Sequence, residues 1–374
     1  MDQLTAIVQA INSYLWGVTG LIPLLVGVGI FYTFKLKFVQ IRKFGQAMRF
    51  TFRGLSLHGE RAGKEGMTSF QSLATAVAAQ VGTGNIAGAA TAIAMGGPGA
   101  IFWMWIAAFF GMATIFAEAV LAQLFKTKDD KGHVTGGPAY YITNGLHCRP
   151  LAIFFSISII IALGFIGNMV QSNSIAVAFQ NAFGIPSLYT GLFVAGFAAF
   201  IFFGGLGSTP HAHAVAKVQF PAQQGLVAIV GLFIDTFVVL NMTAFVIFTT
   251  GVLDGKTTGI ELAQKAFVSG FGSFGLAFVA ICLFFFAFST IVGWYFFAEQ
   301  NVKYLFGTKV ITYFRIGVMC FLCLGSMLHV TLVWELADMF NGLMVIPNVI
   351  ALFGLSKLVA KALNDYDPDY TPHK

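Results

Sequence analysis

The sequence predicts an all-α polytopic membrane protein, on the grounds of its composition, its apolar stretches and the position of its charges. Of the 374 residues, 57% are apolar and 10% are charged, against about 25% charged residues in soluble globular domains. So little charge cannot cover a water-soluble fold. The net charge of +6 is compatible with nucleic acid or with an anionic membrane face, and the position of the basic residues decides between them.

Nine stretches are apolar over enough length to cross a bilayer, which takes about 20 residues per helix. The predicted spans are residues 14–34, 68–95, 99–124, 151–179, 185–204, 219–250, 271–297, 310–327 and 331–360. Because their number is odd, we expect the two termini on opposite sides of the membrane.

The basic residues test this arrangement, since loops that face the cytoplasm carry the excess of Lys and Arg. Of the 21 Lys and Arg, only Lys256 and Lys265 fall on the side opposite to the others. The sequence therefore predicts an N-terminus outside and a C-terminus in the cytoplasm. Topology explains the positive charge, and nucleic acid is not needed as a partner.

Between the first two spans, apolar residues recur every three or four positions at Ile41, Phe44, Met48 and Phe52. Basic residues fall elsewhere on the helical wheel. The pattern predicts an amphipathic helix in the cytoplasmic interface, and the alternative is a simple basic connector.

The second predicted span is interrupted by the run GTGNIAG at residues 82–88. A broken helix at mid-membrane is tolerable where it lines a protein cavity, and its free carbonyls and amides suit a sodium ion and a carboxylate. The alternative is a close helix crossing through the GxxxG pair Gly84 and Gly88. Composition alone leaves both open.

Polar residues lie on the predicted spans near this point. They are Thr75, Gln80, Thr83 and Asn85 on the second span, Asn168, Gln171, Ser172 and Asn173 on the fourth, and Ser289, Thr290 and Trp294 on the seventh. Each by itself is most simply a structural hydrogen bonder. Their occurrence on three separate spans indicates a shared polar site.

Acidic residues within the spans include Glu118 and Asp235, and an ionised carboxylate in lipid costs a few kcal/mol. Asp235 is near mid-span and can serve an ion path or brace a neighbouring helix. Glu118 is nearer the cytoplasmic end, and a structural pair is the favoured interpretation. No HExxH or GxSxG motif is present, so we expect no enzyme, no catalytic residue and no resident cofactor.

The sequence resembles the sodium:alanine (alanine or glycine:cation) symporter family over nearly its whole length. The likeness runs through residues 70–122 and 211–217, and through TGGPAYYITNGL at 135–146, GNMVQSNSIA at 167–176 and FAFSTIVGWYFFAEQ at 286–300. The resemblance implies the inverted five-plus-five helix fold of the amino acid-polyamine-organocation transporters. The implied division is an extra helix at 1–34, an interfacial segment at 35–66, first-repeat helices at 67–205, the rest of the second repeat at 206–360 and a cytoplasmic tail at 361–374.

The resemblance also implies site residues. By the resemblance the substrate would meet Gln80, Gly82, Thr83, Gly84, Asn85, Thr290 and Trp294, and sodium would meet Ala78, Val81, Asn85, Ser289 and Thr290. The polar residues described above add Thr75 and Gln171 to the expected substrate site. Trp294 would wall the pocket and keep it small enough for alanine or glycine. We then expect sodium to be the coupling ion, and we expect the protein to lie in the lipid bilayer of a bacterial inner membrane.

One departure from the family pattern lies at residues 204–210, where FFGG runs directly into LGSTP. Two helices are missing there, on the order of seventy to eighty residues. Losing two spans preserves the orientation of every later helix. The sequence therefore predicts either a sodium-coupled symporter of a small neutral amino acid, or a shortened member that lacks transport or serves as a membrane partner subunit.

Overall fold

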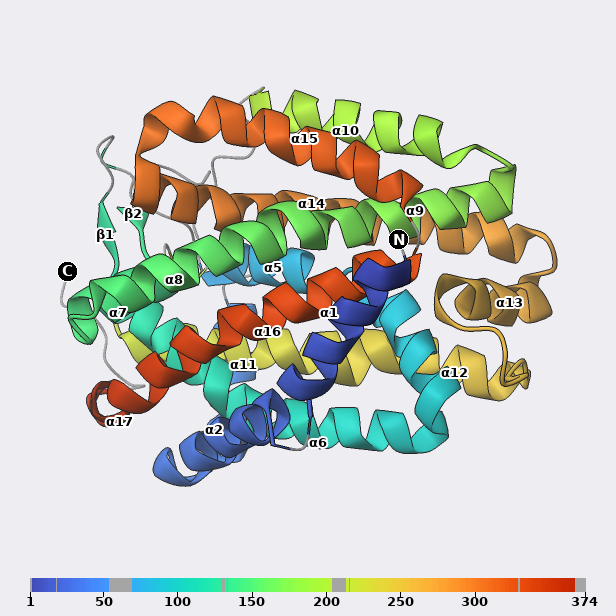
Figure 1. Ribbon diagram of the computed structural model, residues 1–374. Helices are drawn as coiled ribbons and strands as arrows, with labels where there is room; N and C mark the ends of the chain where they lie inside the picture. Colours follow the sequence, from blue (N-terminus) through green and yellow to red (C-terminus); the bar gives the residue numbers. More distant parts are fainter. Residues whose placement is uncertain are drawn as a thin grey trace.

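The computed structural model describes residues 2–17, 19–53, 69–128, 132, 134–203, 213–214, 216–328 and 330–366. Over these residues it is a bundle of long helices that run largely alongside one another (Figure 1). The junction predicted at residues 204–210 lies outside the described residues, as do the later part of the 35–66 segment and the end of the tail.

The described residues are mostly helical. The helices are α1 (Asp2–Leu15), α2 (Leu21–Lys35), α3 (Val39–Arg42), α4 (Phe44–Arg53), α5 (Ser69–Gln80), the π-helix η1 (Gly84–Gly88), α6 (Ala89–Leu124), α7 (Pro138–Gly145), α8 (Arg149–Ile159), the π-helix η2 (Ile160–Gly167), α9 (Asn168–Phe183), α10 (Ser187–Phe203), α11 (Pro221–Phe233), the π-helix η3 (Ile234–Leu240), α12 (Asn241–Thr250), α13 (Gly259–Phe271), α14 (Phe274–Phe306), the short 3₁₀ helix η4 (Thr308–Val310), α15 (Ile311–Met327), α16 (Val330–Gly354) and α17 (Ser356–Asn364). Strands β1 (Thr127–Lys128) and β2 (Val134–Thr135) form one antiparallel pair.

Six helical runs within the described residues are long and apolar enough to cross a membrane. They are Gly84–Leu124, Arg149–Phe183, Pro221–Thr250, Phe274–Phe306, Thr308–Met327 and Thr331–Gly354. Two shorter apolar helices, Leu21–Lys35 and Ser187–Phe203, accompany them. The chain is therefore a multi-pass membrane protein, as its sequence predicts.

The predicted first span begins too early. Tyr14 and Leu15 belong to α1, and the apolar helix that follows starts only at Leu21. Between them the chain turns at Gly17 and Gly20, where an added Cβ would lie 2.7 Å and 2.3 Å from backbone carbonyl oxygens of the preceding turn. Because both helices are apolar, a count of apolar residues runs through the turn between them and does not detect it.

The predicted second and third spans meet inside α6. Gly97 there has φ 58° and ψ −152°, a backbone conformation that glycine adopts readily and other residues avoid. Pro98 follows and opens the next helical stretch. The two parts of α6 consequently run at a steep angle to each other (Figure 1), and the kink falls between residues 95 and 99, where the sequence separates the two spans.

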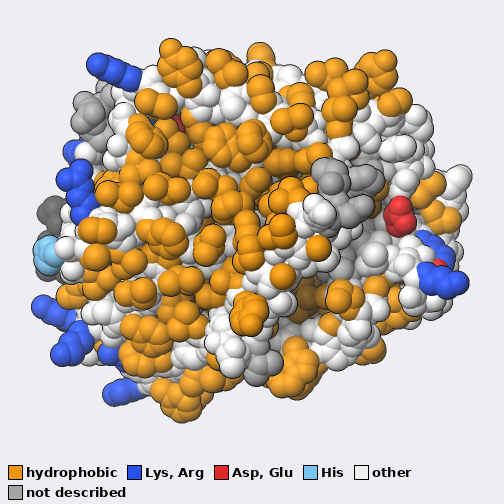
Figure 2. Space-filling model, viewed as in Figure 1, with side chains coloured by type: hydrophobic (Ala, Val, Ile, Leu, Met, Phe, Trp, Pro, Cys, Tyr) orange, Lys and Arg blue, Asp and Glu red, His pale blue; other side chains and the backbone are white. Residues whose placement is uncertain are grey.

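Side chains on the visible face are arranged as a membrane protein requires. Figure 2 shows apolar side chains across the middle of this face, and Lys and Arg gathered at the end of the bundle where α7 and α17 lie. The opposite end, near α13, carries both acidic and basic side chains. This distribution agrees with the sign of the charge asymmetry in the sequence.

The segment after α2 folds back onto the bundle. Phe44 and Met48 of α4 pack against the main apolar core, whereas Ile41 and Phe52 are exposed. In the core itself, α6 packs against α11 and α2, and α14 packs against α9 and α5. These contacts bring the interrupted span α5–η1 against α14, far along the chain.

Candidate functional site

The interruption in the second span is shorter than its glycines predict. Helix α5 ends at Gln80, and from Gly84 to Gly88 the chain is a π-helix. In a regular helix the Gly82 N–H would bond to Ala78 O, but it donates to Asn85 Oδ1 at 3.0 Å. The Asn85 N–H donates to Gly82 O at 3.2 Å. The carbonyls of Ala78 and Val81 are thereby left without their helical donors.

Helix α14 supplies the partners of these carbonyls. Ser289 Oγ lies 3.0 Å from Ala78 O, and Thr290 Oγ1 lies 3.1 Å from Val81 O and 3.3 Å from Ala78 O. The two helices approach closely because Gly293 has no side chain: a Cβ there would lie 2.6 Å from the Ala79 Cβ. We call Ala78 O, Val81 O, Ser289 Oγ and Thr290 Oγ1 the oxygen cluster.

The oxygen cluster holds more acceptors than donors. Both hydroxyls also lie within 3.1 Å of Phe286 O, so two protons serve three carbonyl oxygens. A hard cation of calcium's size binds oxygen at about 2.4 Å, which sets ligands at right angles about 3.4 Å apart, and sodium has nearly the same radius. The spacing and the excess of lone pairs both suit such a cation.

The amides of the interruption already have acceptors. Thr83 N–H donates to Gln171 Oε1 at 3.2 Å, and Asn85 Oδ1 accepts the hydrogen bond from the Gly82 N–H. A Cβ on Gly82 would lie 2.7 Å from Thr290 Oγ1 and 3.1 Å from Gln171 Oε1. The structure thus gathers Gly82, Thr83, Asn85, Gln171 and Thr290, five of the residues that the sequence names, around one point.

Asp235 belongs to this site although the sequence analysis leaves it out of the site residues. Asn85 Nδ2 donates to Asp235 Oδ1 at 2.8 Å and to Asp235 O at 3.3 Å. Of its two interpretations, the brace between helices is therefore present. Its position in the sequence could have identified it, because an acidic residue in the middle of a membrane span is in itself a reason to expect a functional site.

A cavity of about 560 Å³ opens beside the interruption, and its lining includes Gln80, Asp235 and Trp294. Gln80 Oε1 is buried and has no hydrogen-bond partner among the described residues. Trp294 packs across Gly167, where a Cβ would lie 2.6 Å from the indole ring. The cavity is far larger than one alanine, so Trp294 bounds only part of it.

Two predicted site residues lie apart from these contacts. The Thr75 hydroxyl donates to Gln71 O at 2.9 Å within its own helix. A Cβ on Gly84 would meet nothing within 4 Å, and one on Gly88 would meet only the Trp334 side chain at 4.0 Å. The close helix crossing that a GxxxG pair would provide is therefore absent at these two glycines.

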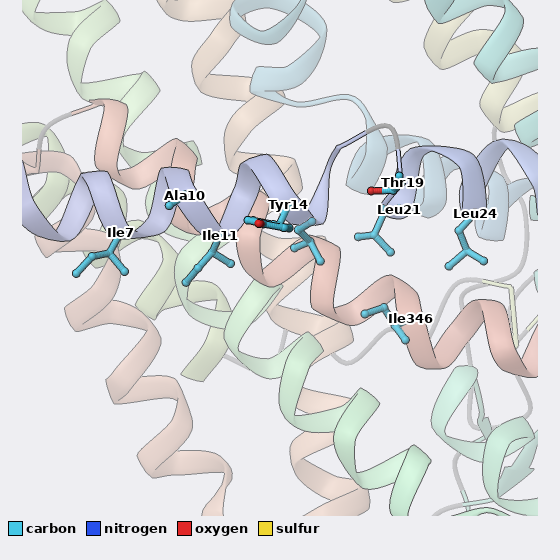
Figure 3. A pocket seen from close by; sticks show the side chains of 10 residues that line it. Ile7, Ala10, Ile11, Tyr14, Thr19, Leu21, Leu24 and Ile346 are labelled. Carbon is cyan, nitrogen blue, oxygen red and sulfur yellow. The ribbon is translucent and has the colours of Figure 1, made fainter.

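A second hollow, of about 820 Å³, is an open groove between α1, α2 and α16. Figure 3 shows Ile7, Ile11 and Tyr14 along one part of it, with Leu24 and Ile346 along another. It is apolar apart from Thr19 and the Tyr14 hydroxyl. The groove offers no charge or amide pair to a zwitterion, which leaves the cavity beside the interruption as the candidate site.

Comparison with known proteins identifies a family of transporters. The model of the sodium:alanine symporter family matches residues 1–206 and 204–373. The sodium/alanine symporter AgcS of Methanococcus maripaludis is 36% identical over 445 residues, covering 96% of this chain and 97% of its own. A probable sodium/glutamine symporter, GlnT of Bacillus subtilis, is 36% identical, covering 96% and 90%. The amino-acid carrier protein AlsT of Bacillus subtilis is 33% identical, covering 95% and 90%.

The same comparisons bear on the missing stretch. The two family matches meet at residues 204–206, where the sequence analysis puts the departure. The alignment with AgcS extends over 445 residues although this chain has only 374, so roughly 80 residues of the relative have no counterpart here, enough for two spans. The family and these relatives are transporters and not enzymes. The chain belongs to the sodium:alanine symporter family.

Proposed function

We propose that the chain carries out sodium-coupled symport of alanine or glycine across a bacterial inner membrane. The oxygen cluster carries the proposal, because two carbonyls without helical donors meet two hydroxyls from a distant helix. The sodium gradient supplies the driving force, and one charge crossing 100 mV adds about 2.3 kcal/mol. No other cofactor is required.

The substrate would bind where the cavity meets the interruption. Its carboxylate would replace Gln171 Oε1 at the Thr83 N–H, and the unpartnered Gln80 Oε1 would accept from its ammonium group. Trp294 would pack against the small side chain. Gly84 stays in this proposal only through the family resemblance, and Thr75 only as a polar residue of the interrupted span.

The finer architecture is part of the same proposal. It has nine spans, with an extra helix at 1–34, first-repeat helices at 67–205 and second-repeat helices at 206–360, incomplete at the junction. The segment at 35–66 lies in the cytoplasmic interface, the N-terminus is outside, and the tail at 361–374 is cytoplasmic. The charge asymmetry of the sequence supports this orientation.

Uptake of labelled alanine into proteoliposomes that contain the purified chain tests the function. An inward sodium gradient should raise uptake at least ten-fold over an equal potassium gradient, and unlabelled glycine and glutamine identify the preferred substrate by competition. Glutamine is included because one relative is named for it. Uptake that is absent at every sodium concentration contradicts symport.

The second candidate is a shortened family member without transport, or a partner subunit, and the roughly 80 missing residues favour it. Members of the family complete their substrate site with a helix from that stretch, according to the resemblance. Titration calorimetry separates the two candidates. Alanine binding that requires sodium supports a symporter, whereas the absence of any heat of alanine binding to a stably folded chain supports the second candidate.

A further inference from the structure

The lining of the same cavity includes a carboxyl group that the symport proposal does not use. Glu118, on α6, lines the cavity together with Tyr141 and Asn348. Asn348 Nδ2 donates to Glu118 Oε1 at 2.6 Å, and the Tyr141 hydroxyl is hydrogen bonded to Asn348 Oδ1. The three side chains come from α6, α7 and α16.

The hydrogen bonds fix how Asn348 is oriented. Because the Tyr141 hydroxyl donates to Oδ1, the amide presents its N–H groups to Glu118. That arrangement satisfies one carboxyl oxygen in either charge state. The second oxygen, Oε2, has no hydrogen-bond partner among the described residues, and Glu118 is only partly buried and lines the cavity.

Among the described residues that line the cavity, no Lys or Arg balances Glu118. Among the described residues that line the cavity, the titratable ones are Glu118, Asp235, Tyr141 and His213. Burial lowers the pKa of His213 to about 4, and its Nδ1 lies 2.7 Å from Gln224 Nε2 as an acceptor; it is neutral at physiological pH. The ion pairs of the described residues involve Asp254 and Glu299 and do not reach Glu118.

An ionised carboxylate in this setting is costly, since the surrounding side chains are largely apolar and lie within the bilayer. The cost is removed by a cation at Oε2. A metal ion needs several further oxygens, whereas the nearest polar group to Glu118 presents N–H. A proton needs only the one free oxygen that the cavity provides.

We propose that Glu118 is a proton-binding site of the cavity, held by Asn348 and Tyr141, which carries its proton at neutral pH. The groups that face it are Asn348 on α16, Tyr141 on α7 and Tyr32 on α2, whose hydroxyl donates to Leu352 O at 2.5 Å. All are uncharged at neutral pH. The inference concerns one carboxyl group and is independent of whether the chain transports an amino acid.

Infrared difference spectroscopy of the full chain in vesicles tests the proposal, because a protonated carboxyl has a C=O stretching band that an ionised one lacks. The wild type at pH 7 without sodium should show this band, and ¹³C-labelled glutamate should shift it, which assigns it to Glu without any substitution. Glu118→Gln should remove that glutamate band. Glu118→Gln keeps the acceptor for Asn348, so the fold is expected to survive.

Two controls sharpen the test. Glu261→Gln, at an exposed position on α13, should leave the band unchanged. Asp235→Asn should leave unchanged the component of the band that shifts with ¹³C-labelled glutamate. The proposal is overturned if the wild type lacks a glutamate band at pH 7, or if the band keeps its full amplitude in Glu118→Gln. Loss of the band on adding sodium at constant pH would also overturn it, in favour of a metal ion.

Discussion

Helix α14 carries two polar clusters of opposite kind, about three turns apart. The oxygen cluster at Ser289 and Thr290 has no charged side chain in its hydrogen bonds. Further along, Glu299 is buried and lies 2.7 Å from Lys303 and 3.4 Å from Arg315, and the Tyr295 hydroxyl is bonded to it. We call these four side chains the charged cluster.

The difference separates a structural cluster from one that can receive an ion. In the charged cluster every charge has an opposite charge beside it, so the group is complete without a ligand. In the oxygen cluster the acceptors outnumber the protons, so the group gains most when a cation enters. The following experiments test this distinction, from the largest expected effect to the smallest.

Glu299→Gln should produce the largest loss of stability. It removes the acidic partner that Lys303 and Arg315 share among the described residues, and breaking a buried pair costs about 3 kcal/mol. Denaturant unfolding of the purified chain in detergent measures the loss. Sodium should not change it, and a sodium-dependent loss would contradict a purely structural cluster.

Gly293→Ala should separate α14 from α5. The new Cβ would lie 2.6 Å from the Ala79 Cβ, and overpacking of this kind costs about 1–3 kcal/mol. The matched control is Gly196→Ala on α10, where a Cβ meets nothing within 4 Å and alanine is expected to be neutral or slightly stabilising in the helix. Equal melting temperatures for the two variants would contradict the close approach.

Thr290→Val should destabilise less but alter the response to sodium. Valine keeps the shape and removes one hydroxyl, which costs about 1 kcal/mol when its partners lose a donor. If the oxygen cluster binds sodium, the variant should lose most of the sodium-induced rise in melting temperature, and Thr290→Ser should keep it. A sodium response as large in the valine variant as in the wild type would remove Thr290 from the ion site.

Asp254→Asn should have the smallest effect, since the Asp254–Lys265 pair at 2.7 Å is exposed. Lys265, with the Thr257 and Lys256 amides, lowers the pKa of Asp254 below its usual range. Its stabilisation is therefore fully present above the ordinary aspartate pKa, near 3.8, starts to decline below that pH, and is lost only as the pH falls through the lowered pKa of the folded state. The melting temperatures of wild type and variant should differ by a constant amount from pH 7 to about pH 4 and begin to approach each other below that, and curves that stay parallel down to pH 3 would contradict the linkage.

Much of the fold follows from the sequence because bilayer length and basic residues constrain it strongly. Hydropathy finds the long spans, and the Gly97–Pro98 pair falls between two predicted helices. Hydropathy does not detect the turn at Gly17 and Gly20, because the helices on both sides of it are apolar. The free amides expected at the interruption have acceptors in this structure, because side-chain oxygens of Asn85 and Gln171 accept the hydrogen bonds of the Gly82 and Thr83 N–H groups.

The site itself was harder to predict than the spans. The family resemblance names Ser289 and Thr290, and the structure brings both to the carbonyls of Ala78 and Val81. Local sequence could not pair Asn85 with Asp235, since 150 positions separate them. The role of Glu118 also depends on a distant residue, Asn348, which no helical spacing connects to it.

The open groove between α1 and α16 has a consequence for how the purified chain should be handled. In water, exposed Ile7, Ile11 and Tyr14 would draw the first helix inward, but hydrocarbon tails are as apolar as these side chains and exert no such pull. Asn12, which donates to Glu335 Oε2 at 2.6 Å, and the Trp16 indole, which donates to Asp338 O at 3.2 Å, then hold that helix together with its packing against α16. A solubilising agent that competes for those few polar contacts will loosen the amino-terminal end before it disturbs the interrupted span.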